Sequence, residues 1–188
     1  MNHQATGEVL SLSIEDAGDG LSPEVFRDLF RNHPAGVAII TADDGSGPVA
    51  LTASSVSSVS AEPPLLMFSL SDQSSASSVI RESETLVVHL LGVGELPLAR
   101  LGSTSGVDRF ASSTEWTRLP SGEPLFHSAK AWIRARIIHS VTAGTSTIVI
   151  VHALESGANG GHEHDRDGRP LVYHNRTWHA LSDRSLAE

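Results

Sequence analysis

Apolar positions recur at two different spacings along this chain, and the first spacing is that of a helix. The helix is predicted to begin at Ser22, a favoured N-cap, with Pro23 in its first turn. Its apolar positions fall on one face: Val25, Phe26, Leu29 and Phe30. Pro34 ends the segment, because the residue before a proline is disfavoured in helix. We expect this helix to act as a lid over one end of the core.

From Gly36 the spacing is that of strands. The expected strands cover residues 36–42, 49–60 with a bend, 65–70, 85–91, 131–138, 145–154, 171–173 and 177–181, and residues 9–14 could add an edge strand. Short helices are expected at 74–83 and 94–101. Residues 131–138 alternate, with Trp132, Arg134 and Arg136 on one face. Many short strands and few helices predict a mainly β protein with an antiparallel barrel. The sequence has neither a βαβ alternation nor a G-x-G-x-x-G after a strand, so a Rossmann fold is not expected.

Length and composition fit one globular domain and exclude several functions. The 188 residues carry 13 lysines and arginines against 22 acids, a net charge of −9, which disfavours nucleic acid or an anionic membrane as the main partner. The chain has no cysteine, so thiolate catalysis, disulfides and cysteine-bound metals are excluded. No apolar run is long enough to span a bilayer, and no signal peptide pattern opens the chain, so a cytoplasmic protein is expected. We divide the chain into a polar leader (1–20), a main domain (21–184) and a tail (185–188).

Small and hydroxyl side chains gather where a barrel would normally place bulky β-branched ones. The run from Thr52 to Ser60 is Thr-Ala-Ser-Ser-Val-Ser-Ser-Val-Ser, which leaves room for a flat group to approach the backbone. Further serines at 69–77 lie before and at the start of a predicted helix, where unpaired N–H groups and the helix dipole favour an anion such as phosphate. A serine-rich surface loop is the alternative, and composition alone favours it.

Three stretches carry a resemblance to a known family. "HPAGVAIIT", "ALTASSVSSVSAEPPLLMFSL" and "VDRFA" occur in the order and spacing of the flavin reductase family, the NAD(P)H:flavin components of two-component monooxygenases. The similarity covers roughly residues 24 to 181. It implies an FMN-binding split barrel, a homodimer with FMN or FAD near the subunit interface, NADH or NADPH as hydride donor, and a partner oxygenase.

The resemblance also implies which residues hold the flavin. Four residues would contact its ring and ribityl chain: Thr52, Ala53, Ser54 and Ser55. Five would follow the ribityl chain to the phosphate: Ser69, Leu70, Ser71, Ser75 and Ser77. Arg109 and Phe110 match an Arg-Phe pair near the flavin of relatives, although Arg109 could instead pair with Asp108, and Phe110 could belong to the core. No residue is assigned as a catalytic acid or base, or as a metal ligand.

The chain departs from the family pattern where relatives carry a histidine associated with nicotinamide binding. Ser146 stands at that position, and Val151 stands where relatives have a later glycine. Ala76 and His89 replace a common threonine and asparagine. A flavin-binding carrier or sensor without efficient NAD(P)H turnover therefore stays open as an alternative, as does a split barrel that binds haem or F420.

Histidines elsewhere are not expected to form a metal site. The one dense cluster, His162, Glu163, His164, Asp165 and Asp167, is interpreted as a solvated loop because no helix spaces the ligands. His89 and His139, each alone in a predicted strand, are interpreted as hydrogen-bonded structural residues. In relatives, the terminal hairpin with Tyr173 and Trp178 lies close to the flavin.

Overall fold

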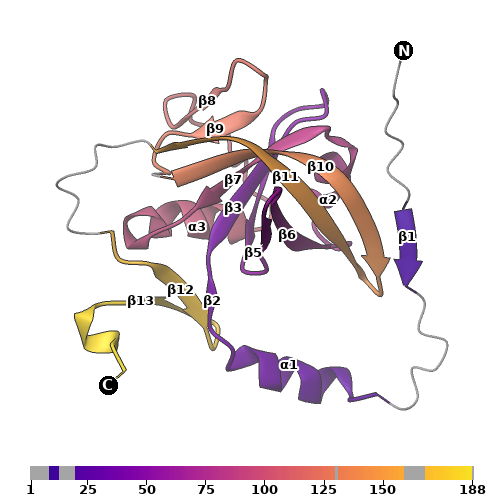
Figure 1. Cartoon of the computed structure of the whole chain (residues 1–188). Helices are drawn as coiled ribbons and strands as arrows, with labels where there is room; N and C mark the ends of the chain where they lie inside the picture. The colour runs from indigo at the N-terminus through magenta and orange to yellow at the C-terminus, as the bar shows by residue number, and fades with distance from the viewer. Residues whose placement is uncertain (1–8, 13–19, 130, 159–167, 188) are drawn as a thin grey trace.

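One sheet of mainly antiparallel strands dominates the computed structural model, which describes residues 9–12, 20–129, 131–158 and 168–187 (Figure 1). Its strands are β1 (Val9–Leu12), β3 (Ala38–Ala42), β4 (Val49–Ala53), β5 (Ser57–Ala61), β6 (Pro64–Ser71), β7 (Thr85–Leu90), β10 (Ala131–Ala143) and β11 (Ser146–Ala158). They run in the order β4-β3-β7-β10-β11-β6-β5, and β1 adds a parallel pairing to β10. The end strands β4 and β5 follow one another along the chain but are not paired in this order. The predicted mainly β, antiparallel class is confirmed.

Shorter elements surround this sheet. A small sheet contains β13 (Thr177–Ala180), β12 (Leu171–His174) and β2 (Ala35–Gly36), and a hairpin pairs β8 (Trp116–Arg118) with β9 (Pro124–Phe126). The helices are α1 (Pro23–Arg31), α2 (Ser77–Glu82) and α3 (Leu96–Ser103), with 3-10 turns at Val93–Glu95 and Asp183–Ser185. The sequence pattern did not predict β8 and β9, and it placed α2 and α3 a few residues too early. Among the helices of the described segments, none is long and apolar enough to cross a membrane.

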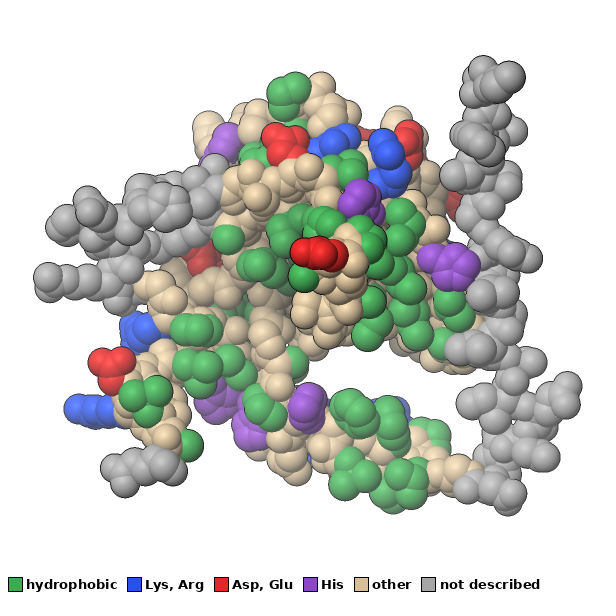
Figure 2. Space-filling model, viewed as in Figure 1, with side chains coloured by type: hydrophobic (Ala, Val, Ile, Leu, Met, Phe, Trp, Pro, Cys, Tyr) green, Lys and Arg blue, Asp and Glu red, His purple; other side chains and the backbone are tan. Residues whose placement is uncertain are grey.

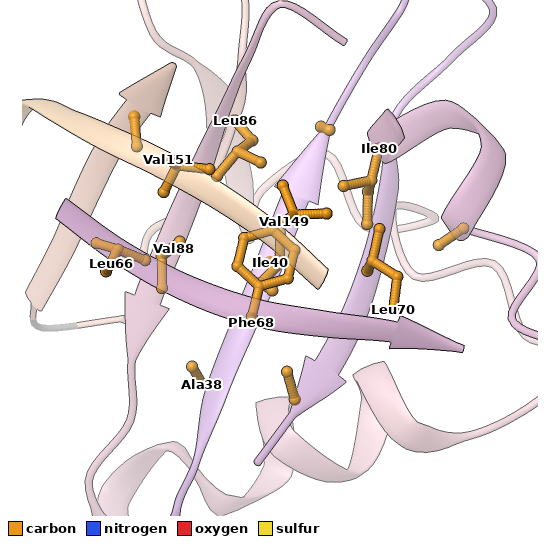
Figure 3. Close-up of a cluster of buried hydrophobic side chains, with 14 residues drawn as sticks. Ala38, Ile40, Leu66, Phe68, Leu70, Ile80, Leu86, Val88, Val149 and Val151 are labelled. Atoms are coloured by element: carbon orange, nitrogen blue, oxygen red, sulfur yellow. The ribbon is translucent and has the colours of Figure 1, made fainter. Parts of the chain in front are cut away.

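The main core lies on one face of the sheet. Alternation along β6 turns Leu66, Phe68 and Leu70 inward while the residues between them are half-buried or exposed. They pack with Ile40 of β3, Val88 of β7, Val149 and Val151 of β11, and Ile80 of α2 (Figure 3). Full burial of side chains of this size contributes roughly 1.5–3 kcal/mol each before entropic costs. This packing holds β6, one wall of the site described below.

A second core cluster joins α3 and the β8–β9 hairpin to the other face of β3. Ile39, Ala99 and Phe126 are fully buried there, and Phe110 stacks on Phe126 at 5.2 Å between ring centroids. His89 of β7 is buried in the same region: it contacts the Ile39 carbonyl and the Phe126 N–H. The interpretation of His89 as a hydrogen-bonded structural residue is confirmed.

The alternation predicted for residues 131–138 is also found in β10. Ala135 is fully buried, and Ile133 and Ile137 pack against the main core. On the opposite face Arg134 pairs with buried Glu123 at 2.7 Å (Nε to Oε1). Thr85 and Ser121 also donate to the Glu123 carboxylate, so the buried charge is satisfied by several partners.

The first helix forms as predicted, but it is not a lid over this chain's core. Ser22 caps it, accepting from the Val25 N–H at 3.3 Å. The helix projects away from the main sheet (Figure 1). It has no buried residue, and its apolar face is exposed. Phe26 and Leu29 are 50% and 61% exposed. Helical periodicity reports that one face is apolar, not which surface covers it.

Candidate functional site

A pocket of about 780 Å³ opens where β4, β6 and the segment after α3 meet. Apart from one leucine and one arginine, its lining is made of small, hydroxyl and amide side chains: Leu51, Thr52, Ala53, Ser54, Ser55, Ser69, Ser71, Gln73, Ser74, Ser75, Gly102, Ser103, Ser105, Gly106 and Arg109. Eight of the predicted flavin residues are therefore brought together: Thr52, Ala53, Ser54, Ser55, Ser69, Ser71, Ser75 and Arg109. We refer to this space as the serine pocket.

One wall of the serine pocket depends on a close approach of α3 to β4. The Thr52 hydroxyl donates to the Ala99 carbonyl at 2.8 Å. Gly102 lies so close that a Cβ on it would be 2.4 Å from Thr52 Oγ1 and 3.2 Å from the Thr52 amide nitrogen. Only glycine fits this approach, and the approach keeps the pocket wall free of a side chain at residue 102.

The opposite rim is formed where the chain leaves β4. Ser55 Oγ accepts from the Ser69 N–H at 3.0 Å and lies 3.3 Å from the Ser69 carbonyl oxygen, to which it can donate. This pairing fixes the backbone of residues 54 and 55 beside β6. Ser54 and Ser69 are exposed at this point and carry no bulk, so a flat ligand can contact the backbone here.

Arg109 provides the positive charge of the serine pocket. Its Nε donates to the Gly102 carbonyl at 3.3 Å, and its NH2 group donates to the Thr104 carbonyl at 2.7 Å. These bonds hold the guanidinium against the segment after α3. The alternative of an ion pair with Asp108 is not found, since the Asp108 carboxylate accepts from the Phe110 N–H instead. The guanidinium charge is therefore available to an anion beside Ser71, Ser75 and Ser105.

Three predicted flavin residues do not line the serine pocket. Leu70 points into the main core (Figure 3). The Ser77 side chain is buried, and its hydroxyl donates to the Ser71 carbonyl at 2.6 Å. Phe110 packs against Trp116 and Phe126, which agrees with the core alternative. Strand alternation could have placed Leu70 inside, whereas the position of Ser77 depends on where α2 begins.

Sequence reasoning missed the side of the pocket that comes from residues 102–106. Gly102, Ser103, Ser105 and Gly106 all line it, and so does Gln73, which was also missed. Ser74, one of the serines expected near a phosphate, lines the pocket too. Gly106 has a φ of +73°, a conformation that favours glycine. The Gly-Ser-Thr-Ser-Gly composition of 102–106 was the available signal, since it continues the pattern of small and hydroxyl residues.

A second pocket of about 870 Å³ adjoins the first and lies between α1, β6 and the β12–β13 hairpin. We call it the α1 pocket; its lining is Arg27, Phe30, Arg31, His33, Pro34, Ala35, Gly36, Ser54, Ser55, Val56, Ser57, Met67, Ser69, Tyr173, His174, Asn175 and Arg176. Ser54, Ser55 and Ser69 line both pockets. Volumes of several hundred Å³ are usual for sites that bind small molecules or cofactors.

Comparison with known proteins identifies the family. The model of the flavin reductase like domain matches residues 30–182. The chain belongs to this family. It is 37% identical over 155 residues to an NADH:FMN oxidoreductase of Rhodococcus qingshengii, covering 82% of this chain and 80% of that protein.

Solved structures of the family share the fold. The crystal structure of a flavin reductase domain protein from Arthrobacter sp. FB24 superposes with a TM-score of 0.77 at 30% identity, covering 85% of this chain and 95% of that one. BorF, the flavin reductase component of a bacterial two-component tryptophan halogenase, superposes with a TM-score of 0.73 at 27% identity, covering 86% and 99%.

None of the four departures from the family pattern lines either pocket. Val151 is fully buried in the main core (Figure 3), and Ser146 begins β11 opposite Ser71 of β6. Neither residue lines the serine pocket or the α1 pocket. Ala76 is buried at the start of α2. His89, the fourth, is buried in the second core cluster region.

The remaining predictions concern the histidine cluster, metal binding and the terminal hairpin. Residues 162–167 lie outside the described part of the chain. Within the described segments no group of three or more histidine, aspartate or glutamate side chains is placed to hold a metal ion. In the terminal hairpin, Tyr173 lines the α1 pocket and packs against Trp178 at 4.7 Å between ring centroids.

Proposed function

We propose that this protein is an NAD(P)H-dependent flavin reductase that supplies reduced FMN or FAD to a partner oxygenase. The observation that carries the proposal is the meeting of two ligand-sized pockets at Ser54, Ser55 and Ser69. A reductase needs two adjoining sites, because a hydride moves only between groups held in contact. The relatives' names, NADH:FMN oxidoreductase and flavin reductase component, support the same activity.

The serine pocket fits a flavin in shape and in chemistry. Ser54, Ser55 and Ser69 would hold the ring where the two pockets join, and no bulky side chain occupies that junction. Arg109 would hold the phosphate, with the hydroxyls of Ser71, Ser75 and Ser105 completing its hydrogen bonds. Thr52 and Gly102 act indirectly by fixing the wall against which the flavin would lie.

The residues of this chain position the reactants rather than exchange protons. A bound flavin supplies the hydride acceptor, so the protein needs no acid or base of its own for the transfer. No residue is assigned that role. Positioning residues at the junction would let the nicotinamide reach the ring from the α1 pocket.

The test is a purified-protein assay with two readouts. We expect FMN to bind, seen as flavin absorbance after gel filtration or as quenched flavin fluorescence, and NADH or NADPH to be oxidised in proportion to added FMN. Flavin binding with negligible nicotinamide oxidation would replace this proposal with the carrier or sensor function. A haem spectrum, or neither activity, would overturn flavin binding itself.

We also infer that the protein is a homodimer and that its sheet is a split barrel. The exposed apolar face of α1 and the exposed Met67 and Leu154 of the sheet support a second copy as their cover. Figure 2 shows apolar side chains on α1 and, across an open gap, on the sheet. The unpaired neighbours β4 and β5 support the split. The flavin near the subunit interface, the oxygenase partner and the cytoplasmic location stay predictions.

A further inference from the structure

The α1 pocket differs in charge from the rest of the molecule. Its lining contains three arginines, two histidines and no aspartate or glutamate. The whole chain has a net charge of −9. A cationic pocket on an acidic protein concentrates anions locally, because the potential of a cleft depends on the charges that line it.

The three arginines are not equivalent. Arg27 pairs with Glu24 and Arg31 pairs with Asp28, each at 3.0 Å along α1. Arg176 has no ion pair within the described part of the chain. It lies exposed at the turn between β12 and β13 with a φ of +60°. Its charge is therefore the least compensated on this surface.

The turn that carries Arg176 is attached to the end of α1. The Asn175 N–H donates to the Arg31 carbonyl at 2.9 Å. Residues 31 and 176 thus belong to one wall, and their side chains line the same pocket. A phosphate group bound there would meet donors from both elements.

Aromatic side chains lie beside these cations. Phe30 of α1 and Tyr173 of β12 both line the α1 pocket. Aromatic faces stack with planar bases, and arginines pair with phosphate oxygens. A ligand with planar rings at its ends and phosphates between them suits this combination.

We propose that Arg176, with Arg31 beside it, binds the diphosphate of the nicotinamide dinucleotide that donates the hydride. The proposal rests on the proposed function and assigns the donor to the α1 pocket. Arg109 lines the serine pocket but not the α1 pocket, so the flavin phosphate and the donor phosphates would have separate cations. Arg176 is a positioning residue, since it holds the donor away from the atoms that exchange the hydride.

The experiment compares donors with and without phosphate on FMN-loaded protein. Arg176→Gln should raise KM for NADH about tenfold, the usual scale for losing a hydrogen bond to a charged group, while kcat changes little. The same variant should oxidise reduced nicotinamide riboside, which lacks phosphate, as the unmodified protein does. Arg176→Lys should restore part of the affinity for NADH, and Arg100→Gln, an exposed arginine of α3, should change nothing.

A binding measurement supplies a readout that needs no turnover. ADP-ribose should bind the FMN-loaded protein, and calorimetry should show its Kd raised about tenfold by Arg176→Gln with the Kd of FMN unchanged. An equal rise in KM for NADH and for the riboside, or no change in ADP-ribose affinity, would refute the role of Arg176. Absence of NADH oxidation in the unmodified protein would instead refute the reductase, and the ADP-ribose result would still decide the phosphate site.

Discussion

His89 is fully buried, and both nitrogens of its ring have partners. Its Nδ1 donates to the Ile39 carbonyl at 3.1 Å, and its Nε2 accepts from the Phe126 N–H at 3.2 Å. An amide N–H can only donate, so Nε2 must be unprotonated and the ring neutral. The ring thus joins β3, β7 and β9 on one side of the second core cluster, and protonation would break the bond to Phe126.

The first prediction is an acid-dependent loss of stability caused by His89. Burial lowers the pKa of His89 from its ordinary 6.5 to about 4, although the hydrogen bond to Ile39 opposes this shift. Because the folded pKa is below the unfolded one, the neutral ring stabilises the fold fully above about pH 6.5. This contribution is lost as pH falls from 6.5 toward 4, and it amounts to roughly 3 kcal/mol.

Urea unfolding at several pH values between about 7 and 4 measures this effect. His89→Gln is the matched variant, because its amide can still donate and accept but does not titrate. It should be less stable near neutral pH and should lose less stability on acidification. Parallel losses in both proteins would show that carboxylates elsewhere, and not His89, control the acid response.

Side-chain direction explains which site residues could be predicted one by one. Ser69 and Ser71 line the serine pocket while Leu70 between them enters the core, as strand alternation requires. The residues of the middle block, Thr52 to Ser55, were singled out by their small size and hydroxyls and line the same pocket, while their contact with a flavin stays a prediction. The sequence alone could not decide whether Phe110 contacts a ligand or belongs to the core, because an aromatic residue beside a cation fits both.

At the scale of elements, the close approach of α3 and β4 leads to the second prediction. Gly102→Ala would place a methyl group 2.4 Å from Thr52 Oγ1 and 3.0 Å from Ile39 Cδ1. Helix propensity alone would favour alanine by about 1 kcal/mol. We expect the steric cost to exceed this gain and to lower the free energy of unfolding by roughly 1–3 kcal/mol.

The same substitution should weaken FMN binding, because Thr52 and Ala53 must shift with the pocket wall. Thermal unfolding and fluorescence titration with FMN measure the two effects. Gly20→Ala is the control, since nothing lies within 4 Å of a Cβ built there. Unchanged FMN affinity in a destabilised Gly102→Ala protein would show that this wall does not shape the flavin site.

Elements long enough to show a clear periodicity were predicted, and the shortest strands were not. The long β-branched strands β10 and β11 were recognised, although both extend further than expected. The three-residue strands β8 and β9 are too short to show alternation, and Pro124 opens one of them. Helix α1 was recognised from its period and caps. Its surroundings could not be predicted, because the spacing of apolar residues in one helix does not determine which surface it contacts.

At the scale of the whole molecule, charge and apolar surface are distributed unevenly. The net charge is −9, yet the α1 pocket is lined by cations, and the apolar face of α1 beside it is exposed. Intramolecular packing cannot account for this helix, since it buries none of its residues. A short isolated helix is only marginally stable in water, so α1 needs a surface to pack on. The proposed second copy of the chain would provide such a surface.

The last prediction is that the protein is a dimer and that the apolar face of α1 holds it together. Light scattering during gel filtration should give about twice the chain mass of 19.9 kDa. Phe26→Lys combined with Leu29→Lys should produce a folded monomer, because both side chains are exposed within one chain and their loss removes no core packing. Ser113→Lys with Ser128→Lys adds the same charge at other exposed positions and should stay dimeric. A monomeric unmodified protein would refute the dimer, and a dimeric Phe26/Leu29 variant would move the interface from α1 to another surface.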